Sequence, residues 1–118
     1  MAIKIYHNPR CSKSRQTLQL INDAGIQPVI VAYLENPPSG DEIRELAERL
    51  GTTVAALLRR GEKDFKEARA LPDLSDDTAL ANWLADHPIV MQRPIVVDGE
   101  SGRAVIGRPP ENVLELLG

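Results

Sequence analysis

A short stretch near the N-terminus gathers cationic side chains around the only cysteine of the chain. Residues 6–15 read Tyr-His-Asn-Pro-Arg-Cys-Ser-Lys-Ser-Arg, so Arg10, Lys13 and Arg15 lie close to Cys11 in sequence. Cations and the free N–H groups at the start of a helix both stabilise a thiolate, and they lower the pKa of such cysteines to roughly 3.5–7.5. The stretch therefore predicts a nucleophilic thiol.

The loop around Cys11 is also suited to binding an oxyanion. Backbone N–H groups at a helix start attract anions, and Ser12, Lys13 and Arg15 are possible contributors to such a site. The alternative is that Cys11 is a small buried apolar residue. The polar residues on both sides of it favour the reactive thiol.

Cys11 has no second thiol with which to form a disulfide. Residues 11–14 read Cys-Ser-Lys-Ser, where a thioredoxin-type redox site would have Cys-x-x-Cys. A redox cycle at Cys11 therefore needs a thiol from another molecule, for which glutathione and glutaredoxin are the expected sources.

The pattern of apolar residues predicts which elements position this loop. Residues 3–6 alternate and predict a strand, and residues 14–24 predict a helix that ends at a glycine. Residues 28–33 form a short apolar run, which predicts a strand buried on both faces. Together they predict a β-α-β unit with Cys11 in the first turn of its helix.

The middle of the chain has the signals of an all-helical insert. Ser39 begins a capping box before an amphipathic helix, and Asp76 is among the capping residues before a later helix. Two shorter helices are predicted between them, at residues 54–60 and 63–69. The insert covers about residues 39–87.

The C-terminal part returns to strands. Residues 93–97 and 103–106 predict a hairpin, and a last helix begins at the prolines after Arg108. The order β-α-β, helices, β-β-α predicts an α/β protein with a thioredoxin-like fold, a mixed sheet and an inserted helical lobe. We expect a single domain over residues 1–118, with a cis-proline position at Arg93-Pro94.

Composition excludes several classes of protein. The net charge is −3 and aromatic residues make up 3%, which argues against nucleic-acid binding. No apolar stretch approaches the ~20 residues of a membrane span, and no signal peptide is recognisable. With one cysteine and two histidines we expect neither a metal site nor a tightly bound cofactor, and a cytoplasmic location is expected.

Several segments resemble the glutaredoxin-coupled arsenate reductase (ArsC) family. They cover essentially the whole chain in order: Tyr6-His7-Asn8-Pro9 with Cys11 and Ser14-Arg15, Tyr33-Leu34-Glu35, Ala56-Leu57-Leu58-Arg59, His87-Pro88-Ile89, Arg93-Pro94-Ile95 and Ile106-Gly107-Arg108-Pro109-Pro110. The residues around Cys11 and the end at Gly118 are more similar to the chromosomal arsenate-reductase-like branch.

The resemblance implies roles for individual residues. The family nucleophile falls on Cys11, and the histidine and serine near it fall on His7 and Ser14. The arginines that hold the oxyanion fall on Arg59, Arg93 and Arg108, with Arg60 as an alternative to Arg59. Guanidinium groups suit this role because each is a planar, permanently charged fork of donors.

The implied function is reduction of arsenate to arsenite through the Cys11 thiolate, with glutathione as co-substrate and glutaredoxin as partner. Two alternatives stay open. One is a glutathione-dependent thiol/disulfide reductase with another substrate. The other is an Spx-like regulator that binds a protein partner, although such regulators often use the Cys-x-x-Cys pair that is missing here.

Overall fold

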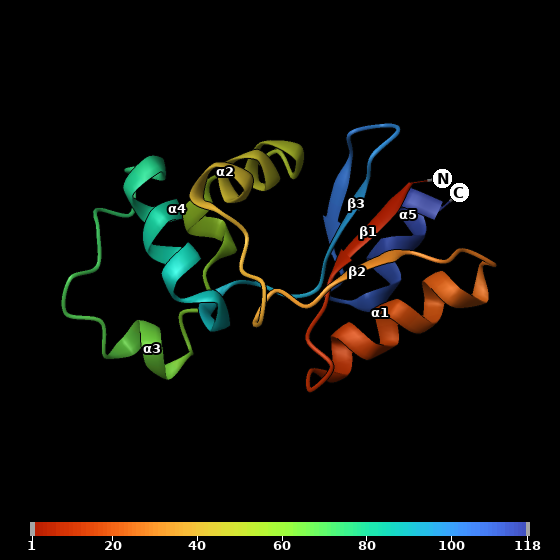
Figure 1. Ribbon diagram of the computed structural model, residues 1–118, viewed down its shortest axis with the longest axis horizontal. Coiled ribbons are helices and arrows are strands. Elements are labelled where there is room, and N and C mark those ends of the chain that lie inside the picture. The colour runs from red at the N-terminus through yellow and green to blue at the C-terminus, as the bar shows by residue number, and fades with distance from the viewer. Residues whose placement is uncertain (1, 118) are drawn as a thin grey trace. The chain divides into compact units, whose positions relative to one another are not determined.

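The computed structural model describes residues 2–117, and its elements follow the predicted order (Figure 1). The elements are β1 (Ile3–Tyr6), α1 (Ser12–Asp23), β2 (Val29–Val31), α2 (Gly40–Arg49), η1 (Val54–Leu57), α3 (Lys63–Lys66), α4 (Asp77–Asp86), η2 (Pro88–Val90), β3 (Ile95–Asp98), β4 (Ala104–Ile106), η3 (Pro110–Val113) and α5 (Leu114–Leu117). Among residues 2–117, none of the helices has the length and apolar character needed to cross a bilayer.

The chain forms two compact units. One contains the residues up to Tyr33 together with those from Arg93 onward, and the other is Leu34–Gln92. All the strands lie in the first unit, and the second contains the inserted helices. The α/β class and the helical insert are confirmed, whereas the single domain stays a prediction.

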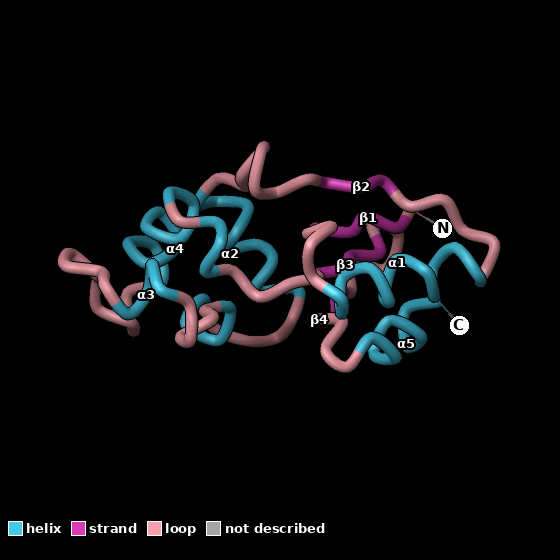
Figure 2. The backbone as a smooth tube through the Cα atoms, turned by 90° about the horizontal axis from the view of Figure 1, so that it is seen from below, coloured by secondary structure: helices cyan, strands magenta, loops and turns pink. Residues whose placement is uncertain are grey.

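The first unit is built on a four-stranded mixed sheet in the order β2-β1-β3-β4. Strand β1 runs parallel to β2 and antiparallel to β3, and β4 is antiparallel to β3. Helix α1 and the η3–α5 segment cover one face of this sheet (Figure 2). The core on that face contains Ile5, Ile21, Val96 and Val113, which are buried completely.

Strand β2 differs from the sequence prediction. It lies at the edge of the sheet, and Val29 and Ile30 are 62% and 52% exposed rather than buried on both faces. The prediction was wrong because an apolar run has the same pattern in a central strand and in an edge strand. Only the position of the strand in the sheet separates the two.

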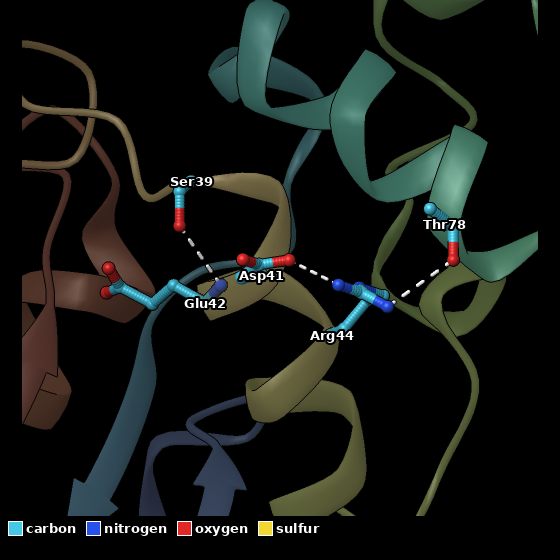
Figure 3. A network of polar contacts seen from close by, with 5 residues as sticks. All are labelled: Ser39, Asp41, Glu42, Arg44 and Thr78. Atoms are coloured by element: carbon cyan, nitrogen blue, oxygen red, sulfur yellow. Dashed lines mark hydrogen bonds and ion pairs between the residues drawn. The ribbon is translucent and has the colours of Figure 1, made fainter.

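The helical unit contains the predicted caps. The Ser39 hydroxyl accepts the Glu42 N–H at 3.2 Å, as a helix N-cap should. Arg44 pairs with Asp41 on α2 and donates to Thr78 of α4 at 3.4 Å, which links these two helices (Figure 3).

The segment predicted as a helix over residues 54–60 is shorter in the structure. It is a 3-10 turn, η1, because the chain becomes extended at Leu58 and pairs with the segment after η2. Leu58 forms an isolated bridge with Met91, and the Arg59 N–H donates to Val90 at 2.6 Å.

Two isoleucines opposite each other in the β1–β2 register test the position of β2. Ile5 is fully buried and Ile30 is half-exposed. We expect Ile30→Thr to change the free energy of unfolding by no more than about 0.5 kcal/mol. Ile5→Thr should cost about 2 kcal/mol or more, since it loses apolar volume and buries a hydroxyl. Urea unfolding measures both, and equal costs would contradict an exposed edge strand.

Candidate active site

Cys11 is the N-cap residue of α1, at the end of a tight loop that follows β1. Its backbone is extended, and its carbonyl accepts the Arg15 N–H at 3.0 Å, so the helix begins directly after it. The Cys11 N–H donates to the Asn8 carbonyl at 3.0 Å, and the Asn8 side-chain oxygen accepts the Arg10 N–H at 3.0 Å. These bonds hold the thiol at the opening of the helix, as the sequence predicted.

The pKa of the Cys11 thiol is lowered by its surroundings. Partial burial is the largest single influence and raises the pKa, but four hydrogen-bond donors together outweigh it. In order of effect these donors are the Ser14 N–H, the Arg93 guanidinium, the Lys13 N–H and the Arg108 guanidinium. The thiolate is therefore favoured both by the start of α1 and by two arginines.

Arg93 and Arg108 reach the thiol from segments that lie far from it in sequence. Nη1 of Arg108 lies 3.7 Å from Sγ of Cys11 and 3.3 Å from the Arg93 carbonyl. Arg93 is only 9% exposed and lies two residues before the start of β3, whereas Arg108 lies two residues after the end of β4. The β3–β4 pairing brings both arginines to the same end of the sheet. Each of them precedes a cis-proline, at Arg93-Pro94 as expected and also at Arg108-Pro109.

His7 and Ser14 form a buried pair behind the loop. Nδ1 of His7 lies 2.6 Å from the Ser14 hydroxyl, which also accepts the Asn8 N–H at 3.0 Å. Burial, and secondarily the charge of Arg15, lowers the pKa of His7. The imidazole is therefore neutral near pH 7 and does not supply a positive charge to the thiolate.

The remaining loop residues differ in their exposure. Ser12 and Arg15 are exposed and Lys13 is half-buried. The Arg15 guanidinium donates to the Pro9 carbonyl at 2.9 Å, which braces the loop against the first turn of α1. Lys13 contributes to the thiol through its backbone N–H.

Arg59 and Arg60 belong to the helical unit, and Cys11 to the unit that contains the sheet. Arg59 is half-buried, and its Nε lies 3.8 Å from a carboxylate oxygen of Glu62. Arg60 is exposed. Arg59 is therefore the more buried of the two arginines and the one with an acidic side chain beside it.

Two residues that support the site were not singled out from the sequence. Asn8 is 4% exposed and organises the loop through its backbone and side chain, and Thr17 is completely buried on α1. The Thr17 hydroxyl donates to the Lys13 carbonyl one turn earlier, at 2.8 Å. The signal for Asn8 was its place before a proline, where Asn side chains often bond the backbone two residues later.

This arrangement combines a nucleophile with an anion site. A thiolate, two helix N–H groups and two guanidinium groups can attack an electrophilic centre and stabilise negative oxygens on it. The part of the chain that the structure describes contains no group of three or more His, Cys, Asp or Glu residues that could hold a metal ion.

Comparison with known proteins gives consistent matches over nearly the whole chain. The model of the ArsC family matches residues 6–116. The uncharacterized protein YfgD of Escherichia coli strain K12 is 47% identical over 98% of this chain and 97% of its own length. An arsenate reductase of Escherichia coli is 43% identical over 98% of this chain and 80% of its own length. A solved arsenate reductase structure from Vibrio cholerae has a TM-score of 0.89 at 46% identity and covers 98% of this chain and 97% of its own.

The lowered pKa of Cys11 predicts the pH dependence of its alkylation. Because only the thiolate reacts and the folded protein favours it, the rate of reaction with iodoacetamide should reach its midpoint clearly below the usual ~8.5. The rate is measured from pH 4 to 10, with urea-unfolded protein as the control. A midpoint in the folded protein at or above that of the unfolded chain would contradict the site.

Proposed function

The chain belongs to the ArsC family, and we propose that it reduces arsenate to arsenite, using the Cys11 thiolate as nucleophile and glutathione as the source of electrons. The observation that carries this proposal is the convergence of two arginines and two helix N–H groups on a single thiol. Arsenate is a tetrahedral oxyanion with an electrophilic central atom. Its reduction therefore needs a nucleophile for the arsenic and donors for the charged oxygens.

In the first step the Cys11 thiolate attacks As(V). A sulfur–arsenic bond forms, and an arsenate hydroxyl takes up a proton from solvent and leaves as water. Arg93 and Arg108, with the N–H groups of α1, hold the charged oxygens during this substitution. A guanidinium group is a planar, charged fork of donors, which suits it to the oxygens of a tetrahedral anion.

In the second step a glutathione thiolate attacks the Cys11 sulfur. A sulfur–sulfur bond forms, the electron pair of the sulfur–arsenic bond passes to arsenic, and arsenite leaves as As(III). Cys11 remains in a mixed disulfide with glutathione. Since the chain contains no other cysteine, a glutaredoxin thiol restores Cys11 by attacking the glutathione sulfur. We therefore expect the reaction to take place in the cytoplasm, where thiols are kept reduced.

Three further residues have proposed roles. The family resemblance supports Arg59 as a third arginine for the oxyanion, and within the helical unit the Val90 and Glu62 contacts hold this residue after the η1 turn. Neutral His7 acts on the thiol only indirectly, by fixing the Ser14 side chain at the first turn of α1. Ser14 also supplies the backbone N–H with the largest effect on the thiolate.

Arginine-to-lysine substitutions test the arsenate site. Lysine keeps the charge but loses the planar fork, so Arg93→Lys and Arg108→Lys should each lower arsenate kcat/KM by about 10²–10³-fold. Sulfate, a tetrahedral anion of the same kind, should compete with arsenate in the parent protein. Steady-state turnover with glutathione and glutaredoxin measures both effects.

Arg103→Lys is the matched control, because Arg103 is exposed and lies in the same unit. It should retain parental activity. Full activity in the two site variants, together with no sulfate competition, would leave a reactive thiol without an arsenate site. Disulfide reduction that persists in the absence of any arsenate turnover would favour the thiol/disulfide reductase.

The glutathione step predicts a defined product. Exposure to glutathione disulfide should add a single glutathione to Cys11, because the lowered pKa supplies a thiolate and no internal thiol competes. Intact-mass spectrometry detects the adduct, and Cys11→Ser should not form it. A Cys11–Cys11 dimer as the main product would contradict an external glutathione cycle.

A further inference from the structure

Gly107 is packed so closely that it has no room for a side chain. A Cβ atom at this position would lie 2.4 Å from Oγ1 of Thr17, 3.0 Å from its Cγ2 and 2.8 Å from Cγ of Pro94. The backbone of Gly107 does not adopt the left-handed conformation that favours glycine. Space, rather than conformation, therefore requires glycine here.

Neither neighbour can move aside easily. Thr17 is fully buried, its β-branched side chain has restricted rotamers, and its hydroxyl is bonded to the Lys13 carbonyl at 2.8 Å. Pro94 is a buried ring whose carbonyl accepts the Gly107 N–H at 2.9 Å. A methyl group at position 107 would therefore displace the backbone of residues 107–108 rather than either neighbour.

The residue that follows is Arg108, whose Nη1 lies 3.7 Å from the Cys11 sulfur. The Asn112 amide donates to the Arg108 carbonyl at 3.3 Å and to the Ile106 carbonyl at 3.2 Å, so the segment is also held from its other side. A methyl at 2.4 Å must move by about 1 Å to reach ordinary van der Waals contact near 3.5 Å. A shift of that size is enough to separate Arg108 from the sulfur.

We propose that Gly107 is a positioning residue, which lets the chain pass between Thr17 and Pro94 closely enough for Arg108 to reach the Cys11 sulfur and an oxyanion bound there. Thr17 is its steric partner from α1. The role in holding an oxyanion rests on the proposed function, whereas the contact between Arg108 and the thiol does not. The absence of a side chain at position 107, after β4, thus allows a cationic side chain to reach the thiol at the start of α1.

The test compares Gly107→Ala with Arg108→Ala and with the double variant. Gly107→Ala should raise the alkylation pKa of Cys11 in the same direction as Arg108→Ala, and it should lower arsenate kcat/KM at least tenfold. If Gly107 acts through Arg108, the alanine at 107 should have little effect once Arg108 is already removed. In the Arg108→Ala background it should change kcat/KM by less than about threefold and the alkylation pKa of Cys11 by less than about 0.5. Equal losses in both backgrounds would overturn the proposal in favour of a general packing defect.

Two further variants separate the steric contact from other effects. Thr17→Ala removes both threonine atoms that meet the new methyl, so adding it to Gly107→Ala should restore at least half of the logarithmic loss in kcat/KM. Gly99→Ala is the control, because its Cβ would meet its nearest neighbours at 3.4 Å, and it should behave like the parent. No rescue by Thr17→Ala would overturn the role of Thr17.

If Gly107→Ala alone does not fold, the proposal is tested with the variant that combines Gly107→Ala and Thr17→Ala. It should fold and keep an alkylation pKa closer to that of Thr17→Ala than to that of Arg108→Ala. The proposal would be overturned if this combined variant did not fold, or if its Cys11 had the alkylation pKa found in Arg108→Ala. The alkylation measurement needs no arsenate, so a parent protein that turns over no arsenate would refute the proposed function and still leave this inference tested.

Discussion

Partial burial of a negatively charged sulfur is the constraint on which the arrangement of the candidate site depends. Burial alone disfavours the thiolate, so the fold must supply donors whose combined effect is larger than that of desolvation. Helix α1 supplies two of them locally, through the N–H groups of Lys13 and Ser14. The other two, Arg93 and Arg108, come from the far end of the chain and reach Cys11 only because β3 and β4 pair. A local helix start and a long-range strand pairing therefore act on one atom.

The local part of this arrangement could be predicted from sequence, because it depends on residues that are close together. Cations around Cys11, the strand pattern before it and the helical pattern after it place the thiol at a helix start. The helix cap at Ser39 was predictable for the same reason. The exposure of β2 could not be predicted in this way. Val29 and Ile30 have the residue types of a buried strand, and only the strand order places them at an edge.

The residues that hold the site in place were harder to recognise than those that perform its chemistry. Little in the local sequence distinguishes Asn8 and Thr17 from other polar residues. They support the site through the hydrogen bonds that they form in the folded chain. The charge state of His7 likewise depends on its surroundings in the folded chain. An isolated histidine near arginines could be charged or neutral, and burial together with Arg15 decides for the neutral form. The Ser14 hydroxyl lies against His7 and accepts the Asn8 N–H, whereas the group of Ser14 that acts on the sulfur is its backbone N–H.

The donors around Cys11 have a consequence for the end of a catalytic cycle as well as for its beginning. A sulfur that is stabilised as a thiolate is also a good leaving group. A mixed disulfide that contains it is therefore cleaved faster and has a more oxidising reduction potential. When another thiol attacks a disulfide formed at Cys11, the departing sulfur regains the Ser14 and Lys13 N–H groups and both guanidinium groups. The same four contacts that prepare Cys11 for attack therefore favour its release, so that a protein with one cysteine returns readily to its reduced state.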